Sequence, residues 1–150
     1  QSPTWGGFSA NLSYAPQSLA YTLLHNVPVR PGKGELLDLV ASVWKTFGEF
    51  GTSQATWLPY WRNGHLVQTD TPNVYVSVYQ RENRLLLVIA NLSKDTPANA
   101  VVKLVPAAAK QSGDYKAARD AVTGASLDLG ANSLRVPCEP MGWRLIEVKG

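Results

Sequence analysis

The chain has 150 residues, 45% of them hydrophobic, and a formal net charge of +3 at pH 7. This length suits one domain, or one domain with a small appendage, and the charged share of 17% is too low for a disordered segment. The fourteen Lys and Arg residues are scattered, which excludes the clustered positive face that nucleic-acid binding needs. No run approaches the roughly twenty apolar residues of a membrane span, and no signal peptide is visible. Because the chain begins at Gln1, we expect a piece of a larger protein.

The residue types that bind metals are sparse and far apart. Cys138 is the single cysteine, so it cannot form an intramolecular disulfide, and its position between Pro137 and Pro140 predicts a small buried hydrophobe. The only histidines, His25 and His65, are forty positions apart in sequence. We therefore expect no metal site and no bound cofactor.

Two segments in the first third of the chain predict helices. Residues 17–25 place Leu19, Leu23 and Leu24 on one face, and prolines then break the pattern. Residues 35–50 show the clearest helical spacing, with Gly51 as a C-terminal stop. The apolar positions of this second helix are Leu36, Val40, Val43, Trp44 and Phe47. Its apolar face must pack on a sheet or on a domain outside the chain.

A hairpin lies at the centre of the remaining sequence. Leu85 to Ala90 is apolar without a break, which predicts a strand buried on both faces. The preceding run, 74–80, alternates: its valines share one face, and Tyr75 and Tyr79 lie on the other. Residues 81–83 between the two runs have turn chemistry.

Further short strands surround this hairpin. Asn63-Gly64 is a hairpin signal, so 57–61 and 66–69 are predicted to pair with each other. The later strands are expected at 100–105, 115–122, 127–129, 134–136 and 143–148. Short strands punctuated by Gly, Pro and Asn favour a sandwich. The predicted fold is mainly β, an antiparallel β-sandwich preceded by one or two α-helices, and α+β overall.

Several strings are similar to those of a known enzyme family. LAYTLLHNVPV at 19–29, VWKTFGEFG at 43–51 and WLPYW at 57–61 resemble the end of the catalytic barrel in bacterial glycoside hydrolases of the family 123 type. VSVY at 76–79, LLVIAN at 86–91, DAVTG at 120–124 and PMGWRLI at 140–146 resemble their C-terminal β-sandwich.

The resemblance implies how the chain is organised. Residues 1–56 would be the tail of a catalytic barrel or a linker, and 57–150 the C-terminal sandwich. The partner would be the upstream barrel of the same polypeptide, with carbohydrate as a further candidate, and a secreted or periplasmic location is favoured. In that family a neighbouring Asp-Glu pair on the barrel carries the chemistry. This sequence has no adjacent Asp-Glu pair, so the resemblance implies that the catalytic residues lie upstream of Gln1.

The acids of the chain itself do not suggest a catalyst. Glycoside hydrolysis usually needs two carboxylates facing each other across the scissile bond. The eleven acids fall mainly on the solvated helix face and in turns, and Asp120 is expected to cap the turn that ends at Gly124. We expect no catalytic residue in this chain, and no catalysis by it alone.

An aromatic cluster is the best candidate for binding. Trp57, Tyr60 and Trp61 offer flat apolar faces that can stack on sugar rings, and His25 could lie near a sugar pocket. The competing interpretation, which we favour, is that these rings pack the helix at 35–50 against the sandwich. Buried rings would argue against binding, and two coplanar, open rings would favour it.

Three functional hypotheses follow from these patterns. The first is a non-catalytic accessory region that braces a glycoside hydrolase barrel. The second is a carbohydrate-binding module, and the third is an independent hydrolase, which requires two acids that converge in a pocket.

Overall fold

The structure is a computed structural model that describes residues 20, 23–25, 35–82, 84–105, 115–130 and 132–149. The predictions for 1–19, for the loop at 26–34 and for 106–114 lie outside the described residues, as does the side chain of Leu36. The elements in chain order are α3 (Glu35–Phe50), the 3-10 turn η2 (Thr52–Gln54), β1 (Thr56–Leu58), β2 (Val67–Thr69), β3 (Val74–Arg81), β4 (Arg84–Asn91), β5 (Ala98–Leu104), β6 (Ala117–Asp120), β7 (Ser126–Leu127), β8 (Ser133–Cys138) and β9 (Trp143–Lys149). Ala20, Leu23 and Leu24, in the first predicted helix, are helical.

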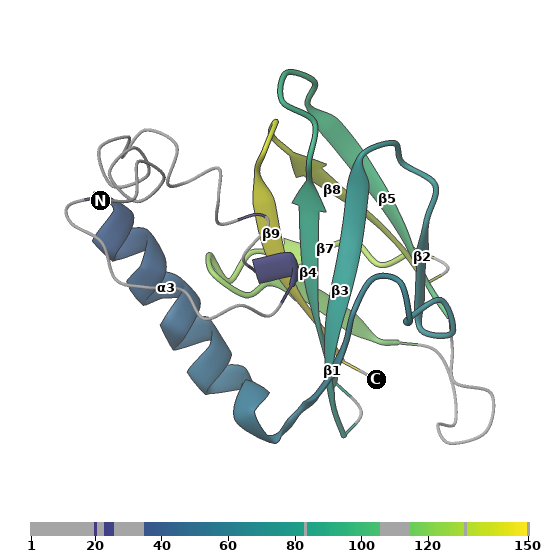
Figure 1. The fold of residues 1–150 in the computed structure, drawn as a ribbon. Coiled ribbons are helices and arrows are strands. Elements are labelled where there is room, and N and C mark those ends of the chain that lie inside the picture. The colour runs from purple at the N-terminus through teal and green to yellow at the C-terminus, as the bar shows by residue number, and fades with distance from the viewer. Residues whose placement is uncertain are drawn as a thin grey trace.

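The strands form two sheets, as the sandwich prediction requires. The larger sheet has the order β1-β3-β4-β9-β6-β7, and the smaller has the order β2-β5-β8. Every described strand pair in both sheets is antiparallel. Figure 1 shows β2, β5 and β8 on one side of the β3–β4 hairpin and α3 on the other. The predicted fold class is confirmed: an antiparallel β-sandwich with a helix before it.

The β3–β4 hairpin is the centre of the fold. Its register runs from Val74 opposite Asn91 to Arg81 opposite Arg84. Beyond Arg84, every side chain of β4 is buried. Leu87 and its alternate neighbours face the interior between the sheets, whereas Leu86 and Val88 pack under the helical layer. The unbroken apolar run therefore reflects a strand that is covered on both faces.

Helix α3 packs on the larger sheet, which answers the question of what its apolar face contacts. Val43 and Phe50 are buried in a cluster with Tyr79 and Leu86 from the sheet. The prediction that Trp44 belongs to this face is wrong, because its side chain is 47% exposed. Successive helical residues are rotated by about 100°, so a residue next to Val43 points well away from the sheet.

Gly51 ends α3 as the sequence predicts. Its φ is +83°, in the left-handed region, and its N–H donates to the carbonyl of Phe47 at 2.9 Å. The Arg81 guanidinium approaches the same point and donates to the Phe50 carbonyl at 2.9 Å. A Cβ on Gly51 would lie 1.7 Å from Arg81 Nη1. The glycine therefore provides both the helix end and the space for its arginine cap.

Replacing Gly51 with alanine is expected to lower the free energy of unfolding by about 1–3 kcal/mol. The left-handed conformation alone costs a non-glycine residue about 1–2 kcal/mol, and Arg81 must also move. Gly48→Ala is the matched control, since nothing lies within 4 Å of its Cβ position and it lies within α3. This control should stabilise the fold by up to about 1 kcal/mol. Urea unfolding of both variants measures the difference, and equal effects would contradict the account.

The prediction of a hairpin at Asn63-Gly64 is wrong. β1 pairs with β3, whereas β2 pairs with β5 in the other sheet. Asn63 is buried, and its Nδ2 donates to the carbonyls of Leu58 at 3.2 Å and Val76 at 2.7 Å. Its own carbonyl accepts from the N–H groups of Leu66 and Val67, so the chain makes a helical turn here. Asn63 anchors a crossing between sheets instead of a two-residue turn.

Candidate functional site

The structure brings the four residues of the predicted aromatic site together. Trp61 is the hub: its ring centroid lies 4.9 Å from that of Tyr60, 6.1 Å from that of Trp57 and 6.1 Å from that of His25. His25 also meets Tyr60 edge-on, at 5.6 Å and 84°. Helical residues before the sheets and the segment after β1 therefore converge on one point of the fold.

The rings in this cluster are packed edge to face. The planes of Trp57 and Tyr60 are each inclined by 87° to that of Trp61. Trp57 packs into the cluster under α3, and its Nε1 is buried without a hydrogen-bond partner, so that group cannot serve a ligand. Trp61 is 57% exposed. The criterion of two coplanar, open rings is not met by Trp57, Tyr60 and Trp61, and their contact with carbohydrate stays a prediction.

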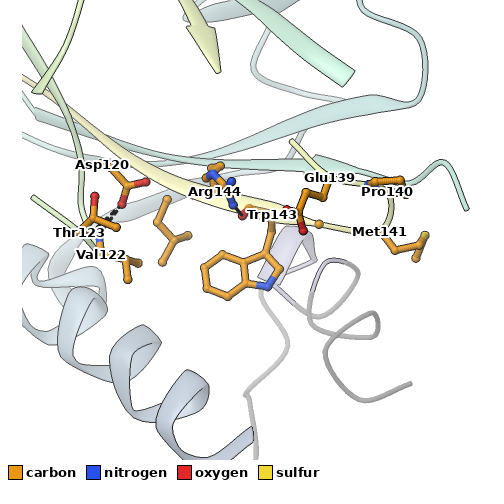
Figure 2. Close-up of a pocket in the computed structure, with 10 residues that line it drawn as sticks. Asp120, Val122, Thr123, Glu139, Pro140, Met141, Trp143 and Arg144 are labelled. Carbon is orange, nitrogen blue, oxygen red and sulfur yellow. Dashed lines mark hydrogen bonds between the residues drawn. The ribbon is translucent and has the colours of Figure 1, made fainter. Parts of the chain in front are cut away.

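A second feature is a pocket at the end of β9, with a volume of about 500 Å³ (Figure 2). We call it the Trp143 pocket, lined by Asp120, Val122, Thr123, Glu139, Pro140, Met141, Gly142, Trp143, Arg144 and Leu145. Its origin lies in the register, because β6 pairs with β9 only as far as Asp120 opposite Ile146. The N-terminal end of β9 is left open beyond that point.

The Trp143 pocket is relevant to the hydrolase hypothesis, because it contains two acids. Figure 2 shows Asp120 at one end of the pocket and Glu139 at the other, with Arg144 and Trp143 between them. Asp120 Oδ1 accepts from the N–H groups of Val122 and Thr123, both at 2.9 Å. The predicted turn cap is confirmed. The arrangement therefore favours a structural role for Asp120 over a role as one of two facing catalytic acids.

The most buried acid was not singled out by the sequence. Glu147 on β9 is 4% exposed and lies in ion pairs with Arg119 at 2.5 Å and Arg84 at 3.4 Å. The Arg84 guanidinium also lies 5.1 Å from the ring centroid of Phe50 in α3. These three charged residues, the Glu147 cluster, join β4, β6 and β9 and reach the helix. All of its side chains are committed to one another, which marks a structural role.

Two further groups have their ionisation shifted by burial. Desolvation raises the pKa of Tyr79 to about 12, and the Phe47 ring of α3 lies over it at 5.4 Å. Desolvation also raises the pKa of the Cys138 thiol, which is free and buried as the sequence predicts. Both groups are neutral at physiological pH and pack as parts of the core.

Metal binding and membrane insertion find no support in the described part of the chain. Within it, no three His, Cys, Asp or Glu side chains come together in a way that could hold a metal ion. Its helices include none with the length and apolar character to cross a membrane.

With the fold and its side-chain clusters in view, the chain can be compared with known proteins. The class of protein is a β-sandwich of the kind found at the C-terminal end of glycoside hydrolases. Residues 39–105 match the family model described as "Glycoside hydrolase 123, C-terminal domain", which confirms the resemblance drawn from the sequence. No curated protein of similar sequence was found.

Solved structures of similar fold are much longer chains. An α-amylase from Anoxybacillus is 9% identical and superposes with a TM-score of 0.55, covering 82% of this chain and 24% of its own. A maltogenic α-amylase from Thermotoga neapolitana is 10% identical, with a TM-score of 0.51, covering 83% of this chain and 28% of its own. The present chain thus spans about a quarter of either enzyme. At these identities the similarity establishes the fold alone.

Proposed function

We propose that this chain is the non-catalytic C-terminal region of a glycoside hydrolase and that it braces the catalytic barrel upstream of it. The observation that carries the proposal is the match of residues 39–105 to a C-terminal domain of a glycoside hydrolase family, because such a domain implies a catalytic domain before it. The commitment of Asp120 and Glu147 to structural contacts agrees with a supporting role.

The surface that we assign to the barrel contains two tryptophans. Trp44 on α3 and Trp61 after β1 are 47% and 57% exposed, although the neighbouring aromatics Phe47 and Trp57 are packed inside. Covering an indole removes much of a large apolar area from water, worth about 25 cal/mol per Å². Both tryptophans lie in segments that resemble the end of a barrel, so the barrel is the partner that we assign to them.

The division of the chain belongs to the same proposal. Residues 1–56 would lead in from the barrel, and 57–150 would form the sandwich. The contact of α3 with Tyr79 and Leu86 supports a lead-in that is anchored on the sandwich. An anchored lead-in restrains the two domains, which is what bracing requires.

The test uses Trp44→Ser and Trp61→Ser together in the full gene product. We expect its unfolding midpoint to fall by several degrees, since each kcal/mol is worth about 2–4 °C in a protein of 150–250 residues and somewhat less in a larger one. In the isolated 150-residue chain the same pair should change stability by less than about 1 kcal/mol, because exposed sites usually contribute within about 0.5 kcal/mol each. Equal losses in both proteins would contradict the bracing role.

Carbohydrate binding through Trp57, Tyr60, Trp61 and His25 is the second candidate function. The observation in its favour is that the four rings gather at one point, with Trp61 open to solvent. It is tested separately, by the titration described next.

A further inference from the structure

We propose that a groove beside this cluster, at the free edge of β3, binds a neutral oligosaccharide. The inference goes beyond bracing, and it rests on the proposed function in one respect, namely that the parent protein acts on carbohydrate. The groove has a volume of about 470 Å³, within the range of about 300–1,000 Å³ typical of small-molecule sites. We call it the tyrosine groove, after Tyr60 and Tyr75.

The groove arises because β1 covers only part of β3. The pairing ends with Leu58 opposite Val78, and the chain then crosses to the other sheet, where β2 begins at Val67. The stretch from Val74 to Val76 therefore has no strand beside it on this edge within the described part of the chain. Asn63 takes the place of a ladder partner by donating to the Val76 carbonyl at 2.7 Å. The groove lies over this uncovered stretch.

Two tyrosine rings form the aromatic wall of the groove. Tyr75 is 38% exposed, and its ring centroid lies 5.0 Å from that of the half-buried Tyr60, with the planes inclined by 58°. Trp61 packs edge-on against Tyr60 and supports it. Two inclined rings can contact the apolar C–H faces of a sugar from two directions, while their hydroxyl groups remain polar.

The opposite wall is polar and carries hydrogen-bonding groups. Gln68 and Asp70, both exposed, line the groove with Thr69 between them. Gln68 Nε2 donates to the Gly64 carbonyl at 3.0 Å, so its amide is oriented. Both N–H groups of Asn63 are engaged, which leaves Oδ1 as its acceptor. Carboxylate and amide oxygens accept hydrogen bonds from sugar hydroxyls.

The charge of the lining indicates which ligands fit. Among the described residues that line the groove, Asp70 is the one charged side chain, and no Lys or Arg is present. A phosphate or another anion would meet a carboxylate without a cation to offset it. A neutral polyhydroxylated ligand avoids this cost. By contrast, the Trp143 pocket contains Arg144 as well as two acids, so its lining gives no such discrimination.

The experiment is a calorimetric titration of the 150-residue chain with three neutral probes: maltotriose, xylotriose and N,N′,N″-triacetylchitotriose. We expect at least one to bind, and Tyr75→Ala to weaken that binding at least tenfold. Tyr75→Phe keeps the ring and should stay within about threefold of wild type, if stacking dominates. Trp44→Ala removes an exposed aromatic outside the groove and should leave the Kd unchanged. Gln68→Ala, at an exposed position, should weaken binding at least threefold and serves if Tyr75→Ala does not fold.

Three results would overturn the proposal. These are no binding of any probe by the wild type, unchanged binding in both Tyr75→Ala and Gln68→Ala, or an equal loss in Trp44→Ala. The bracing role is measured by unfolding of the full gene product without sugar. Failure of the groove and failure of the bracing role are therefore separate observations.

Discussion

Replacing Glu147 with alanine is expected to lower the free energy of unfolding by about 3–5 kcal/mol, the range for removing one partner of a buried ion pair. The carboxylate is nearly inaccessible to water and pairs with two arginines from different strands. Without it, Arg84 and Arg119 would face each other with no anion between them. Chemical denaturation at pH 7 measures the loss.

Arg119→Ala provides the matched comparison for Glu147. Its side chain is 45% exposed, and Arg84 would remain to pair with the acid at 3.4 Å. We expect a cost of about 1 kcal/mol, as for a partly exposed ion pair. If Glu147→Ala cost no more than Arg119→Ala, the Glu147 cluster would not be a buried anchor of the three strands.

Replacing Leu87 with alanine is the second change with a large expected effect, about 2–5 kcal/mol. The side chain is fully buried between the two sheets. Leu86→Ala should cost a similar amount although its side chain points the other way, into the cluster under α3. The pair tests whether both faces of β4 belong to a core.

Val122→Ala is the control for these two leucine variants. Val122 is 40% exposed, so its truncation should change stability by less than about 0.5 kcal/mol. Thermal unfolding of the three variants gives the comparison. A large cost for Leu87→Ala with a negligible cost for Leu86→Ala would mean that α3 does not cover the sheet in solution.

The sequence predicts those elements whose signals are local. The apolar run in β4 and the alternation in β3 each state how many faces of the strand are covered, and both were confirmed. The spacing in α3 identified the helix and its end at Gly51. The error at Trp44 arose at the margin of the apolar face, where periodicity alone does not separate a packed ring from an exposed one.

Long-range features could not be read in the same way. Asn-Gly usually indicates a hairpin, yet Asn63 is held by the Val76 carbonyl thirteen residues away, and this tertiary contact overrides the local preference. The partners of Glu147 lie 28 and 63 residues away, so no short motif marks them. Alternation along the last strand does place Glu147 on the same face as Leu145, which is a weak signal that it is buried.

The aromatic site shows both outcomes in one place. The string WLPYW predicted that Trp57, Tyr60 and Trp61 act together, and the structure gathers them with His25. The tyrosine groove could not be predicted, because it depends on where β1 stops pairing with β3. The partner ring of Tyr60, Tyr75, was recognisable from the sequence only as part of an alternating stripe.

The central claim is that this domain braces a barrel, and deletion tests it most directly. The unfolding midpoint of the catalytic barrel is measured in the full gene product and in a variant that lacks residues 35–150. We predict a midpoint at least about 4 °C lower without them, which corresponds to roughly 1–2 kcal/mol of stabilisation. An unchanged midpoint, or a full gene product no larger than the 16.3 kDa of this chain, would contradict the account.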